Sequence, residues 1–399
     1  MIGNVMKPLE NLRVLDLSRI LSGPYCTMVL ADFGADVIKV ERPGSGDDTR
    51  DWVPPFIGDE SAYFLSVNRN KRSLTLDLKS PEGKEIIFRL AKWADVVVEN
   101  FRPGTAEKLG IGYETLKELN PRLIYCAISG FGQTGPYRDK PGYDAVGQAM
   151  GGLMSVTGYP ELPPVRFGVA IADLGAAMWS LVGILSALQA REQTGRGQYL
   201  DTSLFEGQLS WLTYVAGNYF ATGKNPERHG SAHPNIVPYQ AFETSDGAVM
   251  IAIGNDGLWQ KFVVAIGRPE LGDDPDYASN AARAAHRAEL IDILSEVFKG
   301  RTTDAWLEQL TQGGVPVSPI QSVADVVADP HAAARDMFVK LQHPTVGEVT
   351  VTGIPVKFSE TPGEIVTPPP TLGQHSEEVL LELGYSQDDI TELQKNSVI

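Results

Sequence analysis

LRVLDLSRILSGPYCTMVLADFGADVIKV, residues 12–40, alternates short strand-like runs with a helical segment. Residues 13–17 form a short run dominated by Val and Leu, which is typical of a buried strand. A helix is predicted over 26–33, after Gly23-Pro24, and a second strand over 35–40. Strands separated by helices of this length indicate a parallel α/β sheet, with ligand-binding loops at the carboxyl ends of its strands.

The same alternation extends in both directions along the chain. Strands are predicted over 73–76, 95–99 and 123–128, with a helix over 80–91 between the first two. From Asp173 the composition changes, because Leu174–Ala190 is rich in Ala, Leu and Met and predicts a long, largely buried helix. The remaining expectations are a strand-like stretch over 166–171, mostly helix over 200–220, a loop over 225–238, a strand over 248–253, helices over 259–317 and an amphipathic helix over 376–383.

Composition limits the possible functions. The chain has 399 residues, of which 43% are hydrophobic, and a formal net charge of −16. Such acidity disfavours general nucleic-acid binding, and a polyanionic ligand requires local clusters of Lys and Arg. Residues 1–9 lack a signal-peptide pattern and no uncharged apolar run reaches about 18 residues, so a soluble, cytoplasmic protein without a membrane span is expected, or a mitochondrial matrix protein in a eukaryote. Cys26 and Cys126 are interpreted as buried thiols.

Three basic stretches lie beside predicted strands. Residues 40–50 carry Arg42 and Arg50, residues 70–72 read NKR, and residues 100–104 read NFRPG with Lys108 close behind. By itself the first stretch is better interpreted as a solvated surface turn. Together, in so acidic a chain, the three predict one polyanion site.

Several familiar motifs fail on their context. GFGQTG, residues 130–135, matches a dinucleotide fingerprint, but Pro136 follows at once and no helix begins there. His229 and His233 have the spacing of helical metal ligands, but Gly230 and Pro234 predict a loop, so no metal site is expected. No G-x-S-x-G elbow is present.

Asp173 has two interpretations. It lies between the strand-like stretch and the long helix, where an N-cap residue is expected, and capping is the usual role of Asp at such a position. A helix N-terminus also stabilises a carboxylate, and its free N–H groups could stabilise an oxyanion. Spacing alone leaves both interpretations open.

Several motifs occur together in one order: VLDLSRILSGP (14–24), DVIKVERPGSGD (36–47), NRNKRS (68–73), VENFRPG (98–104), TGRG (194–197) and LGQH (372–375) with EVL (378–380) and ELG (382–384). With them the chain resembles the family III CoA-transferases, from about Leu12 to the C-terminus. Within that family GYDAV (142–146), IVPYQAF (236–242), GVP (314–316) and HPTVG (343–347) most resemble succinyl-CoA:glutarate (hydroxymethylglutarate) CoA-transferases. Dicarboxylic acids are the substrates that this likeness implies.

The resemblance implies roles for individual residues. The family's nucleophile, an Asp at the start of the long helix, matches Asp173. Tyr143 stands where the family's racemases have a proton-exchanging histidine, which disfavours racemisation because a phenol is a poor base near neutral pH. Gly230 and His233 match a glycine-rich substrate flap, here with a single glycine. The positions that match the family's CoA contacts are Leu21, Ser22, Arg42, Leu76, Lys79, Asn100, Phe101, Arg102 and Lys108.

The resemblance also implies a reaction and a fold. The reaction is covalent transfer of CoA through aspartyl-acyl anhydride and aspartyl-CoA intermediates, with a CoA thioester as substrate and no permanent cofactor or metal. The fold is a large Rossmann-like α/β domain over 1–224, a small domain over 225–323 and a segment over 324–399 that returns to the large domain, assembled as an interlocked homodimer. Two alternatives stay open: an acyl-CoA racemase of the same family, and a non-catalytic acyl-CoA-binding protein.

Overall fold

The computed structural model describes residues 6–399, so the start of the segment 1–9 lies outside it. The chain divides into two compact units. The first contains the described residues up to Leu153, together with Arg166–Ala221 and Pro330–Ile399. The second contains Met154–Val165 and Thr222–Asp329, a range that includes the predicted small domain at 225–323.

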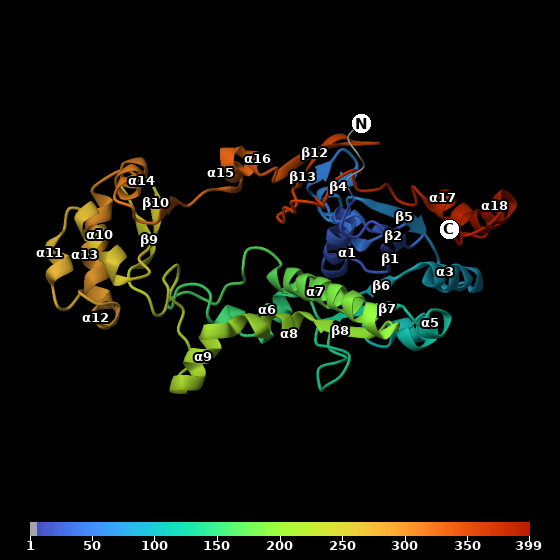
Figure 1. Ribbon diagram of the computed structural model, residues 1–399, viewed down its shortest axis with the longest axis horizontal. Coiled ribbons are helices and arrows are strands. Elements are labelled where there is room, and N and C mark those ends of the chain that lie inside the picture. Colours follow the sequence, from blue (N-terminus) through green and yellow to red (C-terminus); the bar gives the residue numbers. More distant parts are fainter. Residues whose placement is uncertain (1–5) are drawn as a thin grey trace. The chain divides into compact units, whose positions relative to one another are not determined.

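A six-stranded sheet organises the first unit (Figure 1). All its strands are parallel, in the order β5-β2-β1-β6-β7-β8, which confirms the predicted α/β fold. The chain builds outward from β1 to one side and then returns to build on the other, so the strand order reverses between β1 and β6. The strands are β1 (Arg13–Asp16), β2 (Asp36–Glu41), β5 (Lys71–Thr75), β6 (Val96–Glu99), β7 (Ile124–Ser129) and β8 (Tyr199–Ser203).

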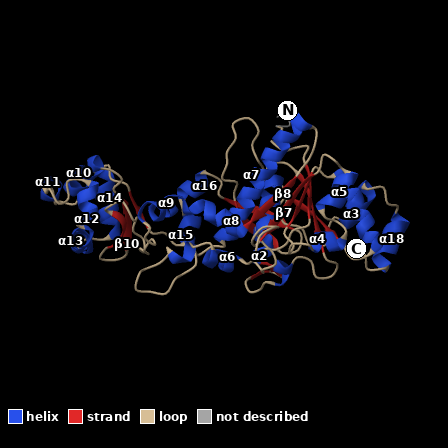
Figure 2. Ribbon diagram, turned by 90° about the horizontal axis from the view of Figure 1, so that it is seen from below, coloured by secondary structure: helices blue, strands red, loops and turns tan. Residues whose placement is uncertain are grey.

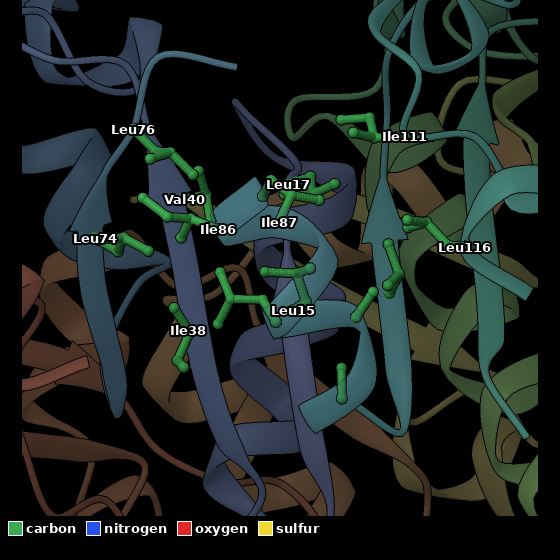
Figure 3. Close-up of a cluster of buried hydrophobic side chains, with 14 of the residues drawn as sticks. Leu15, Leu17, Ile38, Val40, Leu74, Leu76, Ile86, Ile87, Ile111 and Leu116 are labelled. Carbon is green, nitrogen blue, oxygen red and sulfur yellow. The ribbon is translucent and has the colours of Figure 1, made fainter. Parts of the chain in front are cut away.

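Helices cover both faces of this sheet (Figure 2). Successive strand residues point to opposite faces, so Val14 packs against one helix layer and Leu15 against the other. On one face Leu15, Ile38 and Leu74 meet the side chains of α3 (Figure 3). The helices on that face are α3 (Pro81–Trp93), α5 (Tyr113–Leu119), α17 (Ser376–Glu382) and α18 (Gln387–Lys395), and those on the other are α1 (Ser22–Asp32) and α7 (Ile171–Thr194).

Helix α7 confirms the predicted long helix over 174–190. Its Ala172, Ala176 and Ala177 are buried against α1 and the sheet. Among the described helices it alone is long and apolar enough to cross a membrane, with 44% of its apolar window buried, and the core helix of a soluble protein passes the same test. It ends at Gly195, whose φ of 71° suits glycine at a helix C-terminus.

The predicted mostly helical stretch over 200–220 is confirmed from Leu204 onward, but its first residues belong to the edge strand β8. The strand-like stretch predicted over 166–171 is wrong, because residues 166–170 are irregular and Ile171 begins α7. β8 is half-exposed and runs directly into α8, with Ser203 accepting a hydrogen bond from the Glu206 N–H as its cap. β8 therefore lacks the apolar run that marks the central strands, which are buried on both faces.

Shorter elements complete the first unit. They are η1 (Asp48–Asp51), β3 (Phe56–Ile57), β4 (Glu60–Ser61), α2 (Ala62–Ser66), α4 (Thr105–Leu109), α6 (Asp144–Met150), η2 (Leu153–Ser155, which runs into the second unit), α8 (Leu204–Leu209), η3 (Ser210–Leu212), α9 (Thr213–Thr222, which also ends in the second unit), α16 (Pro330–Ala334), β12 (Phe338–His343) and β13 (Gly347–Thr352). The C-terminal segment docks on β5, where the Ser73 N–H donates to His375 Nδ1 at 3.1 Å.

The second unit has its own core. Helices pack against a three-stranded antiparallel sheet in the order β11-β10-β9 (Figure 1). Trp259, Phe262 and Phe298 are fully buried at its centre. The elements are β9 (Tyr239–Glu243), β10 (Ala248–Ala252), α10 (Asp256–Ala265), α11 (Glu270–Asp273), α12 (Asn280–Ala285), α13 (Arg287–Lys299), α14 (Thr303–Gln312), β11 (Val317–Pro319) and α15 (Val323–Ala328).

Candidate active site

Two cavities open at the carboxyl ends of the parallel strands in the first unit. The large cavity has a volume of about 600 Å³ and the small cavity about 150 Å³. The loops after β1 and β6 line both, and Arg19 and Phe101 belong to both linings. Ligands bind where the strand order of such a sheet reverses, so these cavities occupy the expected place.

The large cavity combines positive charge with apolar walls. Arg19, Arg42 and Lys79 supply positive charge from the loops after β1, β2 and β5. The buried Lys39 also lines the cavity, as do the carboxylates Glu41, Asp47 and Asp77. Asp48 lies between the two arginines, with Oδ2 at 2.9 Å from Arg19 Nη1 and Oδ1 at 2.5 Å from Arg42 Nη2. The apolar lining consists of Leu17, Val40, Leu76, Leu78, Phe101 and Leu109. A nucleotide that carries several phosphates requires both features, because cations bind its phosphates and apolar walls contact its base.

One of the three predicted basic stretches does not contribute to this site. Residues 70–72 lie at the start of β5, so they are at the amino end of the sheet. Lys71 is fully buried with Asp16, and Arg72 pairs with Asp36, Glu378 and Glu382. Their charges are satisfied within the chain, and the prediction that residues 70–72 join the polyanion site is wrong.

The small cavity contains Asp173. Ser22, Asn100 and Arg102 line it together with Asp173, as does Tyr143. Arg19 and Lys140 add positive charge to the same lining. A partly buried carboxyl therefore faces a small space that cationic side chains border.

Asp173 is not the N-cap of α7. The helix begins at Ile171 after Ala170, so Asp173 is its third residue. The free N–H of Ala172 donates instead to Asp144 Oδ1, at 2.8 Å. Asp144 is fixed in turn, because Gln148 Nε2 donates to its other oxygen at 2.7 Å. The Asp173 carboxyl is thus not used in capping, which corrects the capping interpretation.

The surroundings of Asp173 raise the pKa of its carboxyl from 3.8 to about 7. Burial contributes most, the nearby charge of Asp144 adds to the rise, and a hydrogen bond with Ser22 opposes it. A carboxylate nucleophile must be ionised, so activity should rise with pH through an acidic limb near 7. A desolvated carboxylate is also a stronger nucleophile than a hydrated one.

Replacing Asp144 with Asn is expected to move that acidic limb downward by about one pH unit, because the variant lacks the like charge that raises the pKa of Asp173. The measurement is kcat/KM for the acyl-CoA substrate from pH 5 to 9. Asp139→Asn serves as the control, since Asp139 is exposed and pairs with Arg138. An acidic limb that stays in place in Asp144→Asn would contradict the electrostatic account.

The structure gives GFGQTG a packing role. Gly130, the first residue after β7, lies against Gly142, and a Cβ on either would overlap the other's Cα. This contact closes the loop 130–142 on itself and leads Tyr143 into the small cavity. Glycine is required at 130 and 142 because the two backbone segments approach each other closely. The motif therefore serves packing, and no helix that could bind a dinucleotide follows it.

The other predicted site residues are distributed more widely. Arg42, Leu76 and Lys79 line the large cavity, whereas Leu21 packs with Met28 and Val67 and lines neither cavity. Lys108 is exposed on α4 and also lines neither cavity. Gly230 and His233 belong to the second unit, in a loop as predicted. Sequence reasoning gave no role to Arg19, Asp48, Lys140 or Asp144, although Arg19 and Asp144 stand within quoted motifs.

Comparison with known proteins gives a consistent result. The model of CoA-transferase family III matches residues 9–376. Succinyl-CoA:glutarate CoA-transferase of Homo sapiens is 44% identical over 397 residues, covering 99% of this chain and 91% of that protein. Succinate--glutarate CoA-transferase of Agrobacterium fabrum is 43% identical over 387 residues, covering 95% and 96%. A solved CAIB/BAIF family protein from Brucella suis is 45% identical, with a TM-score of 0.86 and coverage of 95% of this chain and 100% of that one.

Proposed function

This chain belongs to CoA-transferase family III, and we propose that it moves CoA from succinyl-CoA, or a similar acyl-CoA, to a dicarboxylic acid such as glutarate. The observation that carries the proposal is the position of Asp173, a carboxyl with a pKa of about 7 in a small cavity beside a large one that Arg19, Arg42 and Lys79 line. The names of the relatives support succinyl-CoA as donor and dicarboxylates as acceptors.

The two cavities suit the two ends of a CoA thioester. Arg19, Arg42 and Lys79 would bind the phosphates in the large cavity, with the adenine against its apolar walls. Phe101 lines both cavities, so the pantetheine chain would pass it and bring the thioester to Asp173. Asp48 would release one or both arginines to the ligand.

The proposed chemistry uses Asp173 as a covalent nucleophile. A carboxylate oxygen of Asp173 attacks the thioester carbonyl, the C–S bond breaks, and an aspartyl-acyl anhydride and CoA thiolate form. The thiolate attacks the aspartyl carbonyl, which releases the donor carboxylate and leaves an aspartyl-CoA thioester. The acceptor carboxylate then attacks the carbonyl of this thioester, the C–S bond breaks, and a second anhydride and CoA thiolate form. The thiolate finally attacks the acceptor's acyl carbonyl, which forms the new acyl-CoA and restores Asp173.

This sequence of steps keeps the reactivity of the thioester in covalent bonds throughout, so it requires no metal or redox cofactor. Arg102 and Lys140 border the cavity and would stabilise the negative charge that develops on the attacked carbonyl. Excluding water would protect the anhydride and thioester from hydrolysis. The substrate role predicted for Tyr143 would place its phenol beside the acceptor.

We also propose a homodimer. Helix α7 exposes a stripe of large apolar side chains, Met178, Trp179, Val182 and Leu185, between 38% and 48% exposed. Phe220 on α9 is 81% exposed. Monomeric proteins rarely expose apolar patches of this kind, whereas subunit interfaces bury them. Light scattering after size exclusion would measure the mass of the assembly.

The transfer assay tests the proposed function. Succinyl-CoA is mixed with glutarate, hydroxymethylglutarate, malate, itaconate or mesaconate, and each new acyl-CoA is measured by mass spectrometry. Butyrate serves as the monocarboxylate control. Formation of glutaryl-CoA with release of succinate supports the proposal. Deuterium exchange at the α-carbon without acceptor would instead indicate racemase chemistry, and stoichiometric CoA binding without turnover would indicate a binding protein.

A further inference from the structure

The segment between β1 and α1 is held from two sides. Asn100 forms a reciprocal pair with the backbone of Arg19, accepting its N–H at 2.8 Å and donating to its carbonyl oxygen at 2.6 Å. The buried carboxylate of Asp47 accepts the Ile20 N–H at 3.2 Å from each oxygen. Ile20 has a φ of 71°, an unfavourable value for a β-branched residue. Such a conformation persists only where neighbouring groups impose it.

These clamps fix the position of Ser22, the first residue of α1. Ser22 is 3% exposed and lines the small cavity with Asp173. Asn100 Nδ2 lies 3.4 Å from Ser22 Oγ. Because Asn100 Oδ1 is occupied by the Arg19 N–H, the amide must present its nitrogen to Ser22, so the serine oxygen accepts there. The serine proton is then available to the Asp173 carboxyl, which lines the same small cavity and whose pKa Ser22 lowers by hydrogen bonding.

We propose that Ser22 is a positioning residue, whose hydroxyl orients the Asp173 carboxylate for attack. Ser22 then links Asn100 to Asp173 in a series of hydrogen bonds. This role differs from the CoA contact that the family resemblance implies for Ser22. It rests on the proposed function of Asp173 as nucleophile, and it accounts for the clamps that Asn100 and Asp47 place on a strained turn.

Other charged and titratable groups surround the carboxyl. Asp144 on α6 raises the pKa of Asp173, while the Ser22 hydrogen bond lowers it. Tyr63 on α2 is close enough that Asp173 contributes to its raised pKa of about 12. The groups that line the same cavity are Arg19, Arg102, Lys140 and Tyr143. Ser22 is the group that gives Asp173 a hydrogen bond favouring its ionised form.

Three variants test the role. Ser22→Ala removes the hydroxyl, Ser22→Thr retains it, and Ser295→Ala removes a hydroxyl on α13 of the second unit that donates to the Ile291 carbonyl oxygen. The measurements are kcat, the KM for succinyl-CoA and the pH dependence of kcat/KM, with a thermal melt to verify folding.

Ser22→Ala should lower kcat at pH 7 roughly tenfold or more and move the acidic limb upward by about one pH unit, with little change in the donor KM. Ser22→Thr should recover most of the activity, and Ser295→Ala should match the unchanged chain. A higher donor KM with unchanged kcat and limb would show a CoA contact and overturn the inference. Failure of Ser22→Thr to recover activity while folded would overturn it too.

The proposed function can fail separately. If the unchanged chain transfers no CoA, or Asp173→Ala still transfers it, the nucleophile assignment fails. If Asp173→Ala is inactive while folded Ser22→Ala keeps the kcat and pH profile of the unchanged chain, only the positioning role fails.

Discussion

Asp173→Ala should lower the rate of CoA transfer by at least about 10⁴-fold, because removing a covalent nucleophile leaves only binding and electrostatic stabilisation. The fold should be retained. Asp173 does not cap α7, since Asp144 accepts the Ala172 N–H. Its partly buried carboxyl has a raised pKa, so burial of its charge is unfavourable and the side chain can be removed without a large loss of stability. Acyl-CoA products and thermal unfolding are measured on the same sample.

Asp389→Ala is the matched control. Asp389 is also the third residue of its helix, α18, but there it completes a capping box with Ser386. Its removal should lower the melting temperature slightly and leave transfer unchanged. Transfer by Asp173→Ala near the original rate would refute the nucleophile assignment, and loss of its melting transition would show a structural role.

Lys71→Met should destabilise the first unit by about 3–5 kcal/mol, since it leaves a buried carboxylate without its cation. Lys71 Nζ and the Asp16 carboxylate are both fully buried and 3.0 Å apart. The same nitrogen donates to the Pro24 carbonyl oxygen at 2.9 Å and to Asn68 Oδ1 at 3.0 Å. The methionine side chain fills similar space but donates to none of these three acceptors.

Urea unfolding measures the loss, with Lys299→Met as the control. Lys299 pairs with Glu296 on the surface of α13, where ion pairs contribute little, so its midpoint should not move. The double variant Lys71→Met with Asp16→Asn should be more stable than Lys71→Met alone, because it removes the orphaned charge. A free-energy change below about 1 kcal/mol in Lys71→Met would contradict this account of the buried network.

The central strands were predictable because they are buried on both faces. Residues 13–17, 35–40, 95–99 and 123–128 are short stretches rich in apolar residues, and each overlaps a strand of the sheet. The edge strand β8 was not predictable in this way, since it is half-exposed, contains Asp201 and Thr202, and is followed by a helix without a loop. Periodicity reports burial, so it fails where burial is partial.

The candidate site was foreseeable in part. Loops after β2 and β6 were expected to bind a polyanion, and Arg42 and Phe101 line the large cavity. Residues 70–72 were assigned to the same site because of their charge, although they lie at the start of β5 and ligands bind at the carboxyl ends of parallel strands. Position alone left a capping role open for Asp173 beside the nucleophile role that the resemblance implies, because the start of a helix is uncertain by one or two residues. The contacts of Ser22 and Asp144 with Asp173 and its helix depend on the packing of α1 and α6 against α7, which no local pattern encodes.

Trapping of the covalent intermediate tests the central claim most directly. The protein is incubated with succinyl-CoA, treated with borohydride or hydroxylamine, digested, and analysed by mass spectrometry. The account predicts a mass change on the peptide that contains Asp173, only after acyl-CoA is added, and none in Asp173→Ala. An unmodified Asp173 during active turnover, or a modification at a different residue, would contradict it.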